Sequence, residues 1–321
     1  MKIGFGVAAL LLISPAAAAD TGPWEAVRAV DARMASIAYR LATGNAALCR
    51  ELQPVPGLQL HAIDQYGAAS RAAVRTAFGF TQPVQVEAVV PDSPAAAAGV
   101  MADDAVVMIG DDAVPAPAGE AATSMTRDAA LALLAEQEVT APLRLTLERA
   151  GQLRTATIAP SPGCASGFEV LLGSGMTARS DGRTVQVGAR YFERLDDQQV
   201  AAVVAHELAH TILRHRVRLE AAGVRWGVLA QFGRNARLFR HTEEEADRLS
   251  VHLLHNADYD PHAAVRFWAG EGGRIAGGLF RGPTHPPTKT RINMIAAEIA
   301  VLPPAGPSLP PLLAGRDEPL R

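Results

Sequence analysis

The 321-residue sequence predicts an α+β fold: a mainly helical domain with a small β-sheet, and a separate β-rich module. Three observations support this prediction. Apolar residues from Gln198 to Arg218 recur at helical spacing without Gly or Pro. A second such stretch follows an acidic cluster that begins at Glu243. Between residues 84 and 158, strand-like runs alternate with turns rich in Gly, Pro and Asp.

The first 19 residues have the pattern of a secretory signal peptide. Lys2 gives a positive start, residues 5–13 are apolar, and three alanines ending at Ala19 offer a cleavage site. The apolar run is shorter than the roughly 20 residues that a membrane-spanning helix needs. We therefore expect cleavage near Ala19, a periplasmic or secreted protein, and no membrane span in the mature chain.

The chain has two cysteines, Cys49 and Cys164. A lone pair in an oxidising compartment usually forms a disulfide. The alternative is a thiol ligand to a metal, but neither cysteine has a cysteine or histidine near it at ligand spacing. A bridge would close a loop of about a hundred residues, for which the chain-entropy model gives about 4 to 5 kcal/mol.

The charge balance excludes some classes of partner. The chain has 30 basic and 33 acidic residues and a net charge of -3 at pH 7. This balance argues against nucleic acid or an anionic membrane surface as the main partner.

The segment AHELAH, residues 205–210, has the spacing of a metal site. His206 and His210, four residues apart, lie on one face of a helix and can bind one metal ion, while Glu207 can move a proton on a water molecule at that metal. Zinc is favoured because two imidazoles and one carboxylate form a usual catalytic ligand set. The alternative is a chance match on a helix rich in Ala, Glu and His, so a third ligand is needed to decide.

An acidic cluster downstream, Glu243-Glu244-Glu245-Ala246-Asp247, offers that ligand. We expect it to open a second helix that faces the first. The pairing of HELAH with this cluster resembles the gluzincin peptidases that include HtpX, the CAAX prenyl endopeptidases and soluble periplasmic relatives. The resemblance implies one Zn²⁺ per chain, held by His206, His210 and Glu243. It also implies that Asp247 accepts a hydrogen bond from a ligand histidine. Only the family register separates Glu243 from Glu244 and Glu245.

The segment THPPTKTRI, residues 284–292, resembles the C-terminal His-Pro segment of the same family. The resemblance implies that His285 lies close to the metal, where it stabilises the oxyanion or occupies the open zinc position in a resting state. His285 and Arg291 are therefore candidates for auxiliary catalytic roles. Without the two upstream motifs, His285 would be interpreted as an ordinary loop histidine.

The order of strands and turns from Val84 to Val114 resembles the core of a PDZ domain of the bacterial protease type. The segment Phe78-Gly79-Phe80, the helix expected at 127–135 and the strands expected at 143–147 and 155–158 also match. A departure is Asp103-Asp104, where Gly-Asp is usual. The resemblance implies a groove that binds C-terminal peptides by strand addition, with the Phe78-Gly79-Phe80 loop capping the carboxylate. The alternative is a structural β domain that has lost ligand binding.

We therefore expect a zincin-type metallopeptidase domain with an inserted PDZ-like β domain. The expected parts are a signal peptide (1–19), an N-terminal helical part of the peptidase domain (20–67, with a helix over 24–42), the PDZ-like domain (68–160), the rest of the peptidase domain (161–301) and a Pro-rich tail (302–321). The tail should be disordered or extended along the surface. A short strand at 184–188 should lie before the metal helix, where an edge strand pairs with substrate.

The predicted function is a zinc-dependent endopeptidase acting on polypeptides such as misfolded or envelope proteins, as in protein quality control. The alternative is a PDZ-mediated peptide-binding or chaperone-like protein with a latent or structural zinc site. A hydrolase of a non-peptide amide is a third reading. The PDZ-like module argues against it, because that module indicates polypeptide ligands.

Overall fold

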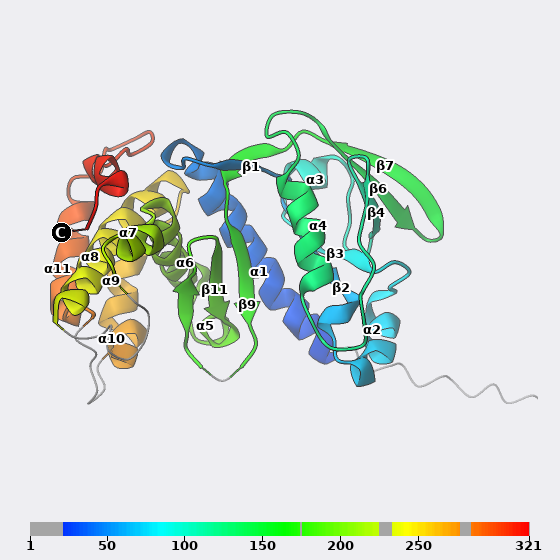
Figure 1. The fold of residues 1–321 in the computed structure, drawn as a ribbon, viewed down its shortest axis with the longest axis horizontal. Coiled ribbons are helices and arrows are strands. Elements are labelled where there is room, and N and C mark those ends of the chain that lie inside the picture. The colour runs from blue at the N-terminus through cyan, green and yellow to red at the C-terminus, as the bar shows by residue number, and fades with distance from the viewer. Residues whose placement is uncertain (1–21, 174, 225–232, 277–283, 321) are drawn as a thin grey trace, which may run out of the picture.

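The computed structural model describes residues 22–173, 175–224, 233–276 and 284–320, so the expected signal peptide lies outside the described residues. Helix α1 (Gly22–Gly44) runs between a helical body and a β-rich body (Figure 1). It contains the helix expected at 24–42. The mixture of helices and sheets confirms the α+β prediction.

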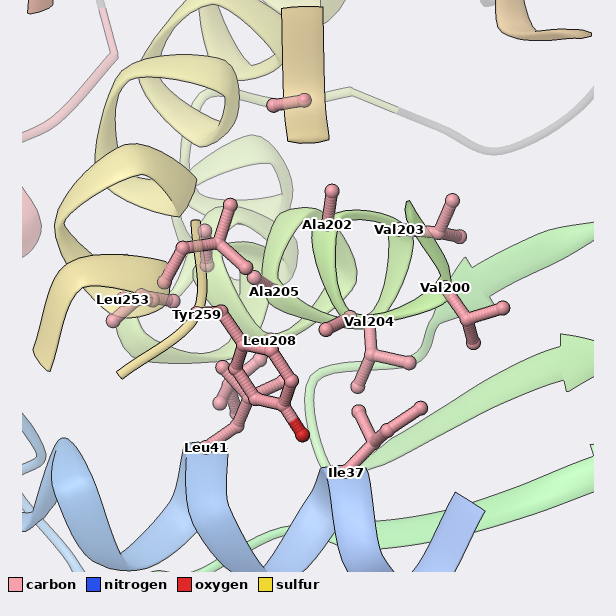
Figure 2. Packing of buried hydrophobic residues seen from close by; sticks show 14 of the residues in the cluster. Ile37, Leu41, Val200, Ala202, Val203, Val204, Ala205, Leu208, Leu253 and Tyr259 are labelled. Atoms are coloured by element: carbon pink, nitrogen blue, oxygen red, sulfur yellow. The ribbon is translucent and has the colours of Figure 1, made fainter. Parts of the chain in front are cut away.

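The helical body is built around helix α6 (Asp197–Ile212). Its other helices are α5 (Ala189–Arg194), α7 (His215–Ala221), α8 (Gly233–Asn256), α9 (His262–Ala269), α10 (Glu271–Ala276) and α11 (Thr288–Ile299). Figure 2 shows Ile37 and Leu41 of α1 facing Val204 and Leu208 of α6, and all four side chains are buried. The metal-binding motif thus lies on a helix whose opposite side is fixed by apolar packing.

Helix α6 begins and ends for identifiable reasons. The Asp196 carboxylate caps it by accepting a hydrogen bond of 2.8 Å from the Gln199 amide. The helix ends at Ile212, earlier than expected, because Arg214 adopts a left-handed conformation with φ of 54°. Helix α7 then continues in a new direction from His215. No Gly or Pro marks this break in the sequence.

Helix α8 packs against α6 and begins at Gly233, well before the acidic cluster. The cluster from Glu243 to Asp247 therefore lies inside the helix rather than at its start, which corrects the expected boundary. Acidic residues favour the first turn of a helix. In the structure they are held instead by cationic side chains of neighbouring helices, notably Arg218 and Arg291.

A three-stranded sheet lies beside α6, with the order β10 (Ala178–Ser180), β11 (Thr184–Gly188) and β9 (Gly167–Leu171). The strand expected at 184–188 is confirmed as β11. It is the central strand, paired antiparallel with β10 and parallel with β9. The edge strand near α6 is β10, so any strand addition on this side takes place at β10.

The second body contains a six-stranded sheet with the path β2-β3-β4-β6-β7, and β5 pairs with β4. Its strands are β2 (Leu58–Ala62), β3 (Val84–Val89), β4 (Ala105–Ile109), β5 (Asp112–Ala113), β6 (Leu143–Arg149) and β7 (Gln152–Ile158). Its helices are α2 (Arg71–Phe78), α3 (Pro94–Ala97) and α4 (Met125–Ala135). The sheet has its own apolar core, which includes Leu60, Val86 and Leu145. Since β2 belongs to this sheet, the module begins before the expected boundary at residue 68.

Two sequence features of this module have structural explanations. Asp103 replaces the usual Gly at a position with φ of 67°, a left-handed conformation that Asp tolerates better than most residues. Phe78 and Phe80 flank Gly79 at the end of α2 and are 2% and 6% exposed. Their rings pack near His61 in a small cluster of their own, so these side chains are not exposed for ligand binding.

The chain enters and leaves the module through one two-stranded ribbon. Strand β1 (Leu52–Val55) pairs antiparallel with β8 (Ser161–Cys164). Beside this ribbon, Cys49 and Cys164 are joined in a disulfide with their Cα atoms 5.4 Å apart. The module therefore has the topology of an insertion into the helical body.

The C-terminal segment from residue 302 to 320 is packed against the helical body and ends close to α7. Ser308 is buried and contacts His252, while Leu320 is buried against Leu219 of α7 and Leu238 of α8. Of the two arrangements expected for the tail, disordered or extended along the surface, these contacts favour the second. Among the described residues, none of the helices is long and apolar enough to cross a membrane.

Candidate metal centre

Three potential ligands converge between α6 and α8. His206 Nε2 lies 3.3 Å from His210 Nε2 and 3.4 Å from Glu243 Oε2, and His210 Nε2 lies 3.5 Å from Glu243 Oε1. Tetrahedral zinc with ligand distances of about 2.0–2.1 Å requires ligand atoms about 3.3–3.4 Å apart. The spacing of the three side chains thus fits one zinc ion, and no other set of three such ligands occurs among the described residues.

The groups around Glu243 favour the ionised form of its side chain. Burial raises its pKa, but the hydrogen bond with His206 and the nearby His210 and Arg291 outweigh burial and hold that pKa well below its usual range. Burial holds the pKa of His210 well below its usual range, so its imidazole is neutral. For His206, burial is outweighed by Asp247 and Glu243, which raise the pKa to about 10. A cation between these groups would replace the proton held there.

Glu207 lies beside the ligands on α6 and lines the same cavity. Burial raises the pKa of its carboxyl to about 7; the positive field of His206 opposes this effect and the Glu243 carboxylate adds to it. A carboxyl group with a pKa near neutrality can both accept and donate a proton at physiological pH. This property fits the predicted role of Glu207.

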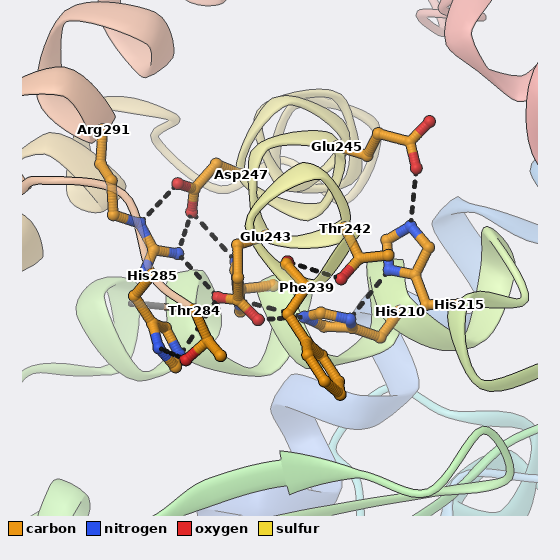
Figure 3. Close-up of polar contacts among 11 residues, drawn as sticks. His210, His215, Phe239, Thr242, Glu243, Glu245, Asp247, Thr284, His285 and Arg291 are labelled. Carbon is orange, nitrogen blue, oxygen red and sulfur yellow. Dashed lines mark hydrogen bonds and ion pairs between the residues drawn. The ribbon is translucent and has the colours of Figure 1, made fainter. Parts of the chain in front are cut away.

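Asp247 supports His206 from behind. Its Oδ1 atom lies 3.0 Å from His206 Nδ1, which brings together the two groups that the resemblance pairs. Arg291 donates two hydrogen bonds to the same carboxylate, at 2.5 and 2.6 Å (Figure 3). Its guanidinium lies 3.6 Å from the centre of the Trp268 ring. Arg291 is 2% exposed and also lies 3.5 Å from Glu243 Oε2. Arg291 therefore helps to hold the ligand residues in place.

His285 occupies a different position. Its side chain is 53% exposed, lines the cavity, and places Nε2 3.7 Å from Glu243 Oε2. Its other ring nitrogen, Nδ1, lies 3.0 Å from the Thr284 hydroxyl. Among the residues selected from sequence for an auxiliary role, His285 has the freer side chain and can approach a group bound in the cavity.

The cavity has a volume of about 950 Å³ and is bounded by the ligands, the β10 edge and helices α9 and α10. Residues 176–182, which contain β10, form one wall, and apolar side chains including Val203, Phe267 and Ile275 form another. An edge strand beside an apolar wall can accommodate an extended chain. The Phe78-Gly79-Phe80 segment and the two cysteines are not among the residues that line this cavity.

Sequence reasoning missed two residues behind His210. His215 fits no ligand spacing in the sequence and would be expected at the surface or at a helix end, yet its Nδ1 atom lies 2.8 Å from His210 Nδ1, and its Nε2 atom lies 3.1 Å from Glu245 Oε2 (Figure 3). Glu245 had been considered only as a competitor to Glu243 for the metal. The order of residues in the sequence could not reveal the pair of His215 and Glu245. His215 reaches His210 only because the helix breaks at Arg214.

Comparison with known proteins agrees with this geometry. Residues 175–299 match the model of Peptidase family M48. This range contains all seven residues selected for the metal site: His206, Glu207, His210, Glu243, Asp247, His285 and Arg291.

The chain is also 32% identical over 118 residues to the mitochondrial metalloendopeptidase OMA1 of Schizosaccharomyces pombe. The alignment covers 30% of this chain and 35% of that protein, so the chain spans about a third of the length of the curated relative. Together, the two matches support a metallo-endopeptidase domain of Peptidase family M48 at residues 175–299.

Proposed function

We propose that this protein is a zinc-dependent endopeptidase of the HtpX and CAAX endopeptidase type that cleaves polypeptides. The observation that carries the proposal is the convergence of His206, His210 and Glu243 at tetrahedral spacing, next to Glu207, in one cavity. Zinc bound there supplies a Lewis acid that polarises the scissile carbonyl and lowers the pKa of the attacking water. Two imidazoles and one carboxylate leave a fourth position open for this chemistry.

The side chains divide the remaining work. Glu207 accepts a proton from the attacking water and donates it to the leaving amine. His285, exposed to the cavity, stabilises the negative oxygen that develops on the substrate. Arg291 supports this chemistry indirectly, since its guanidinium is paired with Asp247.

The shape of the cavity supports a polypeptide substrate. Strand β10 pairs with β11 on one side only, and its residues line the cavity on the other. An extended peptide can add to this edge through backbone hydrogen bonds and present a carbonyl to the metal site. Backbone pairing places few demands on the side chains of the substrate, which suits a protease acting on misfolded or envelope proteins.

The Glu207→Gln variant tests the mechanism. It should retain zinc but cleave unfolded casein more slowly by a factor on the order of 10² to 10⁴, because the proton carrier is lost. Glu244→Gln, one residue after the proposed ligand, is the matched control and should retain both zinc and activity. Wild-type cleavage rates in Glu207→Gln would contradict the mechanism.

The β-rich body supports a second candidate function. We propose that it is a PDZ-like domain that binds C-terminal peptides by addition to β2, which ends the sheet beside α4. Under this alternative the protein is a peptide-binding or chaperone-like protein with a latent zinc site. A peptide that protects β2 amides from hydrogen exchange, together with absent casein cleavage by the zinc-loaded protein, would favour it.

We further propose a periplasmic or secreted location with cleavage near Ala19. The disulfide between Cys49 and Cys164 supports an oxidising compartment. N-terminal sequencing of protein recovered from the periplasm tests this, because a retained leader would contradict the proposal.

A further inference from the structure

A second buried imidazole lies on the Nδ1 side of His210. His215 is 2% exposed, and its ring stands nearly perpendicular to that of His210, with the ring centres 4.8 Å apart. The two Nδ1 atoms are 2.8 Å apart, which is the separation of a good hydrogen bond. On the far side of His215, Nε2 contacts the Glu245 carboxylate at 3.1 Å.

The hydrogen bonds permit one assignment of protons when His210 binds a metal. His210 Nε2 faces the other ligands, so it must offer a lone pair and carry its proton on Nδ1. That proton is donated to His215 Nδ1, which therefore acts as the acceptor. The proton of His215 is then on Nε2 and is donated to Glu245. The chain of bonds selects the tautomer of His210 that binds metal.

The far end of this chain is anchored. Arg218 donates hydrogen bonds to both oxygens of Glu245, at 2.8 and 3.3 Å. It also donates to the backbone oxygen of Glu318 in the C-terminal segment at 3.0 Å. These bonds fix the direction of the Glu245 carboxylate, and hence the ring of His215.

A carboxylate paired with an arginine also supports the other histidine ligand, with one difference. His206 contacts Asp247 directly, and Asp247 is paired with Arg291. His210 reaches its carboxylate and arginine, Glu245 and Arg218, only through His215. Figure 3 shows Asp247 and Glu245 on opposite sides of α8, so the single helix α8 supports both ligands.

We propose that His215 is a positioning residue that orients His210 for zinc binding by relaying its hydrogen bond to Glu245. This inference rests on the proposed zinc function, since it concerns the same site. It means that a residue outside the HExxH motif contributes to the affinity of the site for zinc.

The test compares three variants by zinc affinity, measured in competition with a chelator, and by the absorption spectrum of the Co²⁺-substituted protein. His215→Phe keeps an aromatic ring but no hydrogen bond, so zinc affinity should fall by about 10- to 100-fold with a changed Co²⁺ spectrum. His215→Gln should restore most of the affinity, because its amide can accept from His210 and donate to Glu245.

His252→Phe is the matched control. His252 is 4% exposed and contacts Glu298 at 2.9 Å and Ser308 at 2.7 Å, two residues that take no part in the ligand contacts described above. This variant should lower the thermal stability of the metal-free protein but leave zinc affinity and the Co²⁺ spectrum unchanged. Zinc affinity unchanged in His215→Phe, or lost equally in His215→Phe and His215→Gln, would overturn the relay. A wild-type protein that does not bind zinc would instead refute the proposed function.

Discussion

Arg291 carries a positive charge at a position that is 2% exposed. This burial decides whether Arg291 stabilises the substrate oxyanion or holds the candidate metal ligands in place. A residue that stabilises an oxyanion must direct a donor at the substrate. Two nitrogens of Arg291 are instead engaged by Asp247, which is itself 1% exposed, and the guanidinium lies over Trp268. We therefore assign Arg291 to the support of the metal ligands.

The Arg291→Ala variant should be destabilised by about 3–5 kcal/mol, because it removes the guanidinium that pairs with both oxygens of the buried Asp247 carboxylate and leaves His206 as its remaining partner. Zinc affinity should fall with it, because Asp247 orients His206. Arg266→Ala, which removes a half-exposed pair with Asp260 on a neighbouring helix, should change stability by only about 0–1 kcal/mol. Urea unfolding of the metal-free proteins measures the change in the free energy of unfolding in both variants. If Arg291→Ala lost kcat but unfolded with the wild-type free energy, Arg291 would instead be assigned to the stabilisation of the oxyanion.

The residues of the candidate metal site were predictable to unequal degrees. His206, Glu207 and His210 follow from spacing within one helix, and that spacing is a local property. Glu243 required a family register, because three consecutive glutamates are equivalent in composition. His215 was not predictable. On a continuous helix, it would lie about 140° around the axis from His210, and only the left-handed Arg214 removes that separation.

At the scale of elements, helix α1 joins the two bodies through a buried carboxyl pair. Asp31 of α1 lies within hydrogen-bonding reach of Glu87 of β3, and Arg127 of α4 and Glu169 of β9 lie close by. Two carboxyl groups can share a hydrogen bond only while one of them holds a proton. Burial raises the pKa of Glu87 well above its usual range, and it raises that of Asp31 to about 6 despite the opposing effect of Arg127.

This pair predicts a stability that depends on pH. The folded chain retains a proton on Asp31 up to pH about 6, whereas the unfolded chain releases it near 3.8. Folding therefore binds a proton between these values, so stability should fall as pH rises from about 4 to about 6, and the raised pKa of Glu87 should extend this fall to higher pH. Asp31→Asn should flatten this dependence and raise the relative stability at pH 8, because an amide donates to Glu87 without a titrating proton.

Thermal melts from pH 4 to 8 check this prediction, with Asp112→Asn on the exposed strand β5 as control. The control should follow the wild-type curve. If Asp31→Asn also follows it, the carboxyl pair does not set the pH dependence.

The elements with strong local signals were predicted, and the elements that depend on distant partners were not. Strand β11 and helix α1 follow from periodicity and lie where expected. Strand β2 was missed because its place in the module depends on pairing with β3, which follows in the sequence after α2. The prolines of the tail could not distinguish a disordered segment from one lying along the surface, because the burial of Leu320 and Ser308 depends on helices much earlier in the chain.

At the scale of the whole molecule, one ribbon and one disulfide connect the module to the helical body. Cys164 belongs to the apolar core of the helical body, and it is the last residue of β8, which pairs with β1. The bond to Cys49 thus closes the point at which the chain leaves the helical body and returns to it. The 115-residue separation of the two cysteines encloses the module.

Replacing both cysteines by alanine should therefore lower the free energy of unfolding by about 4–5 kcal/mol, because the unfolded chain gains the freedom of a long open loop. The m-value of urea unfolding should rise, since the unfolded state without a cross-link exposes more surface. Dithiothreitol should lower wild-type stability by a similar amount and leave the double variant unchanged. Equal stability of the two proteins, or free thiols in protein made in the periplasm, would show that the ribbon of β1 and β8 holds the module without the disulfide.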